Sequence, residues 1–310
     1  MMEFKNLIEF QKQFSTELKC IKYLEKLRWG SKKPTCPRCK QNNKTCIHSK
    51  AGLYSCSRCK REFTIRKGTI FEDSALSLTK WFMAFYFEIS SAKTISSYSL
   101  ADKIGTTQRT AWFVQQRVRW ALSNNTIEKM QGDIEIDETY LGGKETNKHE
   151  DKKLKYSQGG NHKMVVVGVL NRKGILGMKY INKSNIKNIK PILDSYIDFD
   201  NANLYTDESP IYKGYKRETV NHSQKEYTNG NASTNSIENT FGLFKRRIYG
   251  IHHQITKKHI DKYLNSFVFY FNNKSLKIAD RFETAMMSMF SNNNLTYAML
   301  TKKEVRGFRY

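Results

Sequence analysis

Three acidic residues in the second half of the chain have the type and setting to bind metal for phosphodiester chemistry. Asp137 ends the sequence DIEID, Asp207 ends NLYTD, and Glu238 lies within NSIENTFGLFKRR. Cleavage with two divalent metals needs carboxylates that hold both ions about 3.5–4 Å apart, astride the scissile phosphate. Because Mg²⁺ prefers oxygen ligands, we predict that these three residues bind two catalytic Mg²⁺ ions, for which Mn²⁺ can substitute.

Taken singly, each acid has an ordinary explanation as an exposed residue beside other charges. The order of the predicted elements favours the metal site. From Gly132 onward the pattern predicts three strands, a helix, a strand, a short helix, a strand and a final helix. This is the order of the ribonuclease H-like fold, in which acids of the first strand, the fourth strand and the last helix converge.

A basic block follows Glu238 on the same predicted helix. Lys245 comes seven residues later, which is nearly two helical turns, so the two side chains share a face. An acid that holds metal and a cation behind it can grip one phosphate backbone at two points. We therefore predict that Lys245, Arg246 and Arg247 contact DNA.

Four cysteines in the first half have zinc-ligand spacing. They form the paired knuckles CPRC, Cys36 to Cys39, and CSRC, Cys56 to Cys59, with sixteen residues between them. Four thiolates close a tetrahedron around one structural Zn²⁺ and leave no open position for chemistry. Cys46 and His48, in the intervening arm, are weaker candidate ligands. A pair of disulfides is the alternative, which a reducing cytosol disfavours.

The surroundings of the cysteines are strongly basic. From Arg28 to Lys67 there are 12 lysines and arginines and one acid, Glu62. Such clustering favours contact between the zinc ribbon and nucleic acid. A protein-binding role for the ribbon remains the alternative.

The sequence ISSYSLADKIGTTQRTAWFVQQRVRWAL, residues 95–122, has the pattern of a helix-turn-helix. We expect Ser97 to cap a first helix, and Thr106 or Thr107 to cap a second after the turn at Gly105. The apolar stripe of the second helix is Ala111, Val114, Val118 and Leu122, whereas Gln108, Arg109, Gln115, Arg117 and Arg119 fall mostly off it. Gln108 and Arg109 are the predicted DNA contacts. An ordinary helical hairpin is the alternative.

Composition supports a polyanionic partner. The 310 residues carry 53 Lys and Arg against 29 Asp and Glu, a formal charge of +24, which points first to nucleic acid. The most apolar window, WFMAFYFEI, is nine residues long, whereas a membrane span needs about 20. No export signal is evident. We therefore expect a cytoplasmic, nucleoid-associated protein with no membrane contact.

These patterns predict a multidomain α/β protein. A small zinc ribbon and a helical helix-turn-helix region precede a ribonuclease H-like catalytic domain with a mixed sheet. The expected divisions are an N-terminal helical segment (1–30), the zinc ribbon (31–70), the helix-turn-helix region (71–130), the catalytic domain (131–275) and a C-terminal tail (276–310).

Several motifs together resemble the DDE transposases of one bacterial insertion-sequence family. They include IEIDETYLGGKETNKH, YTDES, VNHSQKEY, TNSIENTFGLFKRRIYGIHH and KYLNSFVFYFNN, and the likeness runs from about residue 20 to about residue 275. The resemblance implies that Asp137, Asp207 and Glu238 are the metal-binding triad and that Lys245 is the accompanying basic residue. His222 and Asn235 resemble pocket residues of the family. His222 could instead cap a strand, and Asn235 could cap the last helix.

The chain departs from the family pattern at three places. Ser233 stands where a His often precedes Thr-Asn, Phe241 where a Trp often stands, and Ser266-Phe267 where Glu-Phe often stands. The change at Ser233 puts a His-assisted contact there in doubt. None of the three falls on the acid triad.

The resemblance implies a cut-and-paste DNA transposase. It would bind the terminal inverted repeats of its element, cleave DNA with Mg²⁺, and transfer the freed 3′-hydroxyl to target DNA. A homo-oligomer is implied, since two element ends must be held together. The rival interpretations are a non-catalytic DNA-binding regulator derived from such a transposase, and a structure-selective nuclease of the same fold.

Overall fold

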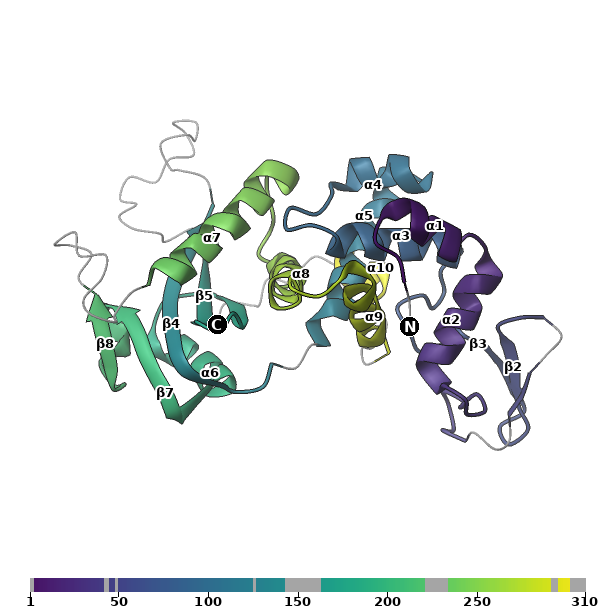
Figure 1. The fold of residues 1–310 in the computed structure, drawn as a ribbon, viewed down its shortest axis with the longest axis horizontal. Helices are drawn as coiled ribbons and strands as arrows, with labels where there is room; N and C mark the ends of the chain where they lie inside the picture. Colours follow the sequence, from purple (N-terminus) through teal and green to yellow (C-terminus); the bar gives the residue numbers. More distant parts are fainter. Residues whose placement is uncertain are drawn as a thin grey trace, which may run out of the picture. The chain divides into compact units, whose positions relative to one another are not determined.

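The computed structural model describes residues 3–41, 45–47, 50–124, 127–142, 163–220, 234–290 and 295–301. The chain divides into two compact units, and Figure 1 shows the helices and strands of each. The first unit combines Met1–Ser91, Ile95–Asn124 and Leu276–Tyr310. The second combines Ala92–Thr94 with Asn125–Ser275. The first unit is therefore built from both ends of the chain.

The first unit is mainly helical, with one small sheet. Its helices are α1 (Leu7–Gln13), α2 (Glu17–Trp29), α3 (Leu78–Ile89), α4 (Ser97–Ile104), α5 (Gln108–Ala121), η1 (Leu122–Asn124), α9 (Ile278–Ser288) and α10 (Tyr297–Thr301). Its strands, β1 (Thr45–Ile47), β2 (Leu53–Cys56) and β3 (Arg61–Thr64), form an antiparallel sheet in that order. The apolar window at residues 81–89 falls in α3, a largely buried helix.

A cluster of aromatic rings joins the two ends of the chain within this unit. Phe282 of α9 lies 5.1 Å from Phe10 and 5.8 Å from Phe4, between ring centroids. Phe82 of α3 lies 5.7 Å from the same ring. Residues 276–310, which we expected to be a tail, therefore include a helix of the core. Ala285 and Met286 extend its buried side at helical spacing.

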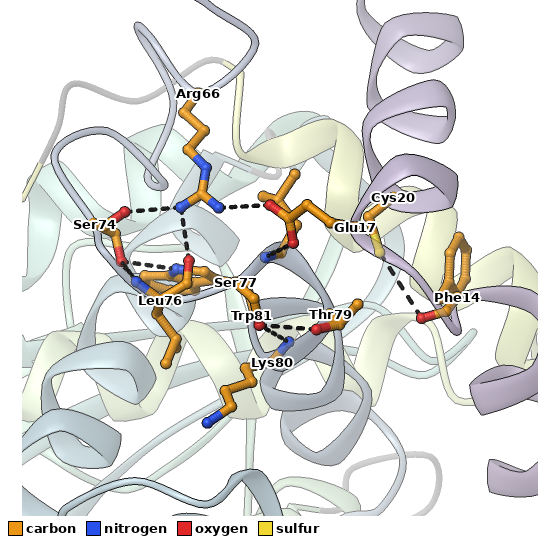
Figure 2. A network of polar contacts seen from close by, with 11 residues as sticks. Phe14, Glu17, Cys20, Arg66, Ser74, Leu76, Ser77, Thr79, Lys80 and Trp81 are labelled. Atoms are coloured by element: carbon orange, nitrogen blue, oxygen red, sulfur yellow. Dashed lines mark hydrogen bonds and ion pairs between the residues drawn. The ribbon is translucent and has the colours of Figure 1, made fainter. Parts of the chain in front are cut away.

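Glu17 connects three segments around the start of α2 (Figure 2). Its Oε1 lies 2.7 Å from Nη2 of Arg66, just after the zinc-ribbon strands, and its Oε2 accepts the backbone N–H of Leu78. Nη1 of Arg66 also donates to the carbonyls of Ser74 and Leu76. The contact with Leu78 satisfies an N–H in the first turn of α3, which intrahelical bonds leave open.

The helix-turn-helix pattern forms as α4, a turn at Gly105, and α5. Thr107 caps α5 and its hydroxyl accepts the N–H of Thr110, which confirms one of the two predicted caps. Gly105 adopts φ +58°, the left-handed conformation that favours glycine. The cap of α4 is Ser96 rather than the predicted Ser97. The predicted boundary was wrong by one residue because both residues are serines.

The polar residues of α5 beyond its first turn are buried, contrary to the amphipathic interpretation. Arg119 is fully buried and donates from Nε and Nη2 to the two carboxylate oxygens of Glu88, at 2.9 and 3.1 Å. Arg117 donates to the Glu72 carbonyl, and Gln115 donates to the Ile95 carbonyl. Their partners lie on other segments, so the periodicity of α5 alone could not identify these residues as buried.

The second unit is a five-stranded sheet covered by helices on both faces. Its elements in chain order are β4 (Met130–Leu141), β5 (Met164–Asn171), β6 (Leu176–Ile181), α6 (Ile186–Tyr196), β7 (Ile197–Asp207), η4 (Pro210–Tyr212), β8 (Arg217–Val220), α7 (Asn235–Arg247), η6 (Ile248–His252) and α8 (Ile260–Asn272). The strand order is β6-β5-β4-β7-β8. The β4–β7 and β7–β8 pairs are parallel and the other two are antiparallel. The predicted order of elements and the mixed sheet are confirmed.

Alternation along the strands divides the core into two layers. Val166 and Leu170 of β5 belong to the cluster that contains Ile237 of α7 and Leu264 of α8. Val165, Val167 and Val169 point the other way and pack with residues of α6 such as Leu193. In β4, Ile134 and Ile136 lie in the α6 layer, so Glu135 and Asp137 alternate onto the α7 side.

No helix in the described parts of the chain combines the length and apolar character that crossing a bilayer requires.

Candidate zinc centre and acid site

The four cysteines of the two knuckles come together as predicted. Their sulfur atoms all lie within 4.8 Å of one another, with Cys36–Cys59 at 3.7 Å and Cys39–Cys56 at 3.5 Å. All four are free thiols, and a disulfide would need sulfurs about 2.05 Å apart. A tetrahedron with Zn–S bonds of about 2.3 Å has edges of about 3.8 Å. The thiol cluster therefore fits one Zn²⁺.

The strands and turns of the ribbon position these thiols. In the first knuckle, the N–H of Lys40 donates to the Cys36 carbonyl, and Lys40 has a φ of +58°. Lys60 follows the second knuckle with the same kind of conformation. The backbone N–H of Cys59 lowers the pKa of Cys56 to about 7, which favours the thiolate that binds metal. Four such ligands leave no open position, so the site is structural.

The two weaker candidate ligands stay untested. Cys46 lies in β1, where its backbone pairs with Ser55, and its side chain falls outside what the structure describes. His48 lies outside the described residues altogether.

Two of the predicted acids lie level with each other on the neighbouring parallel strands β4 and β7. Glu135 of β4 pairs with Tyr205 of β7, so Asp137 and Asp207 each come two residues further along their strands. Asp207 is the last residue of β7. β4 continues beside β5 as far as Leu141, so Asp137 lies within its strand. The parallel register sets it level with Asp207, where β7 ends.

Glu135 attaches the helix that carries the third acid. This side chain is 1 % exposed, and its Oε2 accepts the backbone N–H of Ile237, at 2.9 Å, in the first turn of α7. Its Oε1 accepts from Nε of Arg172 at 3.0 Å. Glu238 is the next residue after Ile237, so Glu135 fixes the point from which Glu238 departs. Sequence reasoning missed this role, because Glu135 looked like one more acid beside Asp137.

Gly168 of β5 allows α7 to approach the sheet closely. It is the pairing partner of Asp137. A Cβ atom at this position would lie 2.7 Å from the Phe241 ring and 2.8 Å from Ile237, both on α7. Only glycine leaves that space. The signal was visible as a single glycine in the apolar run MVVVGVL, but it was not recognised.

Each carboxylate of the acid site has one oxygen held by a neighbour. Oδ1 of Asp137 accepts the backbone N–H of Glu138 at 2.7 Å. Oδ1 of Asp207 accepts the N–H of Ser209 at 3.1 Å. Oε1 of Glu238 accepts from the Thr234 hydroxyl at 3.0 Å. These bonds limit rotation of the carboxylates before any cation binds.

Electrostatics link the three acids. Burial, together with the carboxylates of Glu138, Asp207 and Glu238, raises the pKa of Asp137 to about 7, although the hydrogen bond from the Glu138 N–H lowers it. Burial and the Asp207 carboxylate also raise the pKa of Glu138, whose Oε1 accepts from the Ser184 hydroxyl. Mutual repulsion of this kind is relieved by a divalent cation. The donor set, all carboxylate oxygen, fits Mg²⁺ or Mn²⁺.

The acids are less tightly gathered than the thiols. Among the residues that the structure describes, the four cysteines form the only group of three or more potential ligands packed within 4.8 Å. A two-metal site has a wider span than a single tetrahedral ion, because the ions themselves are about 3.5–4 Å apart.

The three basic residues at the end of α7 differ in their exposure to solvent. Lys245 is half-buried and Arg246 is exposed. Arg247 is fully buried, with Nη2 donating to the Ser266 hydroxyl and Nη1 to the Ala92 carbonyl. Because these contacts bury the Arg247 guanidinium, it is not accessible to DNA in this structure, and its predicted DNA contact is not available.

The remaining predicted residues have mixed outcomes. Asn235 is the first residue of α7, and Thr234, not Asn235, occupies the cap position. His222 lies outside the described residues. Gln108 donates to the Ser97 hydroxyl and is half-buried, whereas Arg109 is exposed.

The fold and the thiol cluster define a multidomain α/β protein with a zinc-ribbon-like cysteine cluster and a five-stranded mixed sheet that carries Asp137 and Asp207 on neighbouring strands. Comparison with known proteins specifies it further. Residues 129–272 match the ISXO2-like transposase domain, and residues 15–62 match a transposase zinc-ribbon domain. The chain is 27 % identical over 276 residues to an uncharacterized protein in transposable element ISH50 of Halobacterium salinarum, covering 83 % of this chain and 91 % of that protein. The chain therefore carries a match to an insertion-sequence transposase domain, preceded by a match to a transposase zinc ribbon.

Proposed function

We propose that this protein is a transposase that binds the terminal inverted repeats of its element and uses Asp137, Asp207 and Glu238 to cleave and rejoin DNA with Mg²⁺. The observation that supports the proposal is the strand register, which sets Asp137 level with Asp207 on neighbouring strands of the sheet that packs against the helix beginning at Asn235. The match to a transposase domain supports it independently.

In this proposal Asp137, Asp207 and Glu238 would hold two Mg²⁺ ions. Such ions lower the pKa of an attacking water or hydroxyl and stabilise charge at the phosphate. The chain's own contribution is orientation. Thr234 and two backbone N–H groups hold the carboxylates, and Glu135 holds the start of α7.

Recognition is assigned to the first unit and to the cations of α7. We infer that Gln108 and Arg109, at the start of α5, contact the element ends, because the N-terminal residues of a recognition helix meet base edges. Lys245 and Arg246 would contact the phosphate backbone near the cleavage site. Two ends in one complex require at least a homodimer, working where the chromosome is, in the cytoplasm.

The test is a set of isosteric substitutions. Asp137→Asn, Asp207→Asn and Glu238→Gln keep shape and remove a charged ligand oxygen. Each should lower Mg²⁺-dependent cleavage of a duplex carrying the element end by at least about 10³-fold, a size typical of losing an essential electrostatic group. Binding to the same duplex should stay within about twofold. Glu208→Gln, next to Asp207, is the matched control and should keep substantial activity.

Two outcomes would change the proposal. If Glu238→Gln cleaved at nearly the wild-type rate, Glu238 would be an ordinary helix acid. If the wild type cleaved ends but never joined them to target DNA in a strand-transfer assay, the nuclease interpretation would replace the transposase one.

A further inference from the structure

The first turn of α5 meets the C-terminal helix α10 within the first unit. Arg109 is the second residue of α5, which begins at Gln108. Its Nε donates to the hydroxyl of Tyr297 at 2.7 Å, and its guanidinium carbon lies 4.9 Å from the centroid of the same ring. Tyr297 is the first residue of α10 and lies 188 positions from Arg109.

Tyr297 is held in place by contacts of its own. Phe113, one turn after Arg109 on α5, meets the Tyr297 ring edge-on at 5.5 Å. Leu295 and Leu300, on either side of Tyr297 in sequence, are 4 % and 2 % exposed. The segment is therefore anchored by buried leucines, and the tyrosine ring is fixed against α5 by Phe113.

The contact uses only part of Arg109. The side chain is exposed, and no other hydrogen bond or ion pair of Arg109 is found among the described residues. A guanidinium offers five N–H donors, and its fork binds a guanine edge or a phosphate through two parallel bonds. The Tyr297 hydroxyl accepts from Arg109 and keeps its own hydrogen to donate.

We propose that Tyr297 is a positioning residue for DNA recognition: it holds Arg109 so that the guanidinium fork can meet a base edge of the element end. This rests on the proposed function, since it assigns end recognition to α5. A free arginine loses much rotamer freedom when it binds. An arginine already held by a ring and a hydrogen bond loses less, so affinity rises.

The inference extends the DNA-reading surface to a part of the chain far from the helix-turn-helix in sequence. The helix-turn-helix ends at residue 122, whereas Tyr297 follows the entire second unit. The opposite role, in which Tyr297 competes with DNA for Arg109, predicts an effect of opposite sign on affinity.

The experiment uses the full-length protein with its zinc. Binding is measured by fluorescence anisotropy at one fixed salt concentration, because phosphate contacts make affinity strongly salt-dependent. The probes are a duplex with the inverted repeat that flanks the gene and a scrambled duplex of equal length. The variants are Tyr297→Phe, Arg109→Ala and the double variant. Tyr180→Phe, which removes a hydroxyl on β6 of the second unit that donates to Asn182, is the matched control.

Tyr297→Phe should weaken binding to the element end by about three- to tenfold and leave binding to the scrambled duplex unchanged, because ordering one rotamer-rich side chain has roughly that effect. Arg109→Ala should weaken end binding more. Adding Tyr297→Phe to Arg109→Ala should have no further effect, since Tyr297 acts through Arg109. Tyr180→Phe should bind as wild type.

The outcomes separate this inference from the proposed function. If Arg109→Ala loses end preference while Tyr297→Phe binds as wild type, the positioning role alone is overturned. Tighter end binding by Tyr297→Phe would overturn it as well and assign Tyr297 as a competitor of DNA. If the wild type shows no preference for the element end, or if Arg109→Ala retains that preference, the proposal that α5 recognises the end is wrong. The positioning role of Tyr297 is then wrong as well.

Discussion

The thiol cluster and the acid site acquire their geometry in different ways. The cysteines come from two short knuckles, and each pair is separated by only two residues. The acids come from two strands and a helix, and their placement depends on Glu135, Gly168 and the register of β4 with β7. A metal bound by the thiol cluster would organise a small fold, whereas at the acid site the fold itself sets the positions of the carboxylates. Loss of the metal should therefore disrupt the zinc centre, and loss of Glu135 or Gly168 should disrupt the acid site.

Removing one thiolate should have the largest structural effect. Cys59→Ser should lose the bound Zn²⁺ and unfold residues 34–70, because metal binding supplies about 10–16 kcal/mol in small zinc modules. Zinc content by elemental analysis and protease sensitivity of the ribbon would measure this. The sheet of the second unit should remain folded. A freshly prepared, reduced wild type without zinc would contradict the assignment.

At the acid site, the support of α7 should be the most sensitive point. Glu135→Ala leaves the Ile237 N–H and Arg172 without their partner and should destabilise the second unit by about 2–3 kcal/mol, because Arg172 is partly exposed and water compensates in part. The Mg²⁺ concentration needed for half-maximal cleavage should also rise, as Glu238 loses its position. Denaturant unfolding and a metal titration measure the two effects.

Glu135→Gln is the conservative comparison. It keeps an acceptor for the Ile237 N–H and removes only the charge facing Arg172. It should recover part of the stability and most of the Mg²⁺ response. If Glu135→Ala had an unchanged Mg²⁺ requirement, Glu135 would stabilise the fold without positioning Glu238.

Gly168→Ala tests the spacing between α7 and the sheet. The new methyl group would collide with Phe241, so α7 or its ring must shift at a cost of about 1–3 kcal/mol. Cleavage should fall more than DNA binding does. Adding Phe241→Leu should restore part of both stability and cleavage. Gly214→Ala, where no atom lies within 4 Å of the new methyl, is the control. Equal behaviour of the two alanine variants would show that α7 tolerates the displacement.

The smallest effect is expected at Lys245, nearly two helical turns after Glu238 on α7. Lys245→Ala should weaken DNA binding modestly and reduce the slope of log affinity against log salt by about 0.9, the contribution of one phosphate contact. Zinc content and stability should not change. Lys187→Ala, an exposed lysine on α6 across the sheet, serves as the control. An unchanged slope for Lys245→Ala would place Lys245 outside the DNA interface.

Sequence patterns predicted the features that depend on local spacing. Short stretches of sequence, in which spacing distinguishes one conformation from another, determine these features. They are the cysteine knuckles, the cap at Thr107 and the order of strands. The expectation that Asp137 and Asp207 lie together came from the likeness of the element order to the ribonuclease H-like fold; in the structure the register of β4 with β7 sets the two residues level.

The spacing of residues could not predict features that depend on a partner far away in the sequence. The buried state of Arg119 requires Glu88, 31 residues earlier, and that of Arg247 requires Ser266 and Ala92. A basic residue on a helix has the same local pattern whether it meets DNA or a buried carboxylate. Residues 276–310 were misjudged as a tail for the same reason, since the rings that α9 covers lie near residue 10.

The position of Phe282 in the aromatic cluster has a consequence for synthesis. During translation, Phe4, Phe10 and Phe14 are synthesised long before Phe282, the ring of α9 that packs against them. Residues 125–275 take about 8–30 seconds to make at roughly 5–20 residues per second. During that interval the second unit can fold as a block, while the first stays open with apolar rings uncovered. A product truncated before α9 would thus fold its sheet unit and still lack a complete helical one.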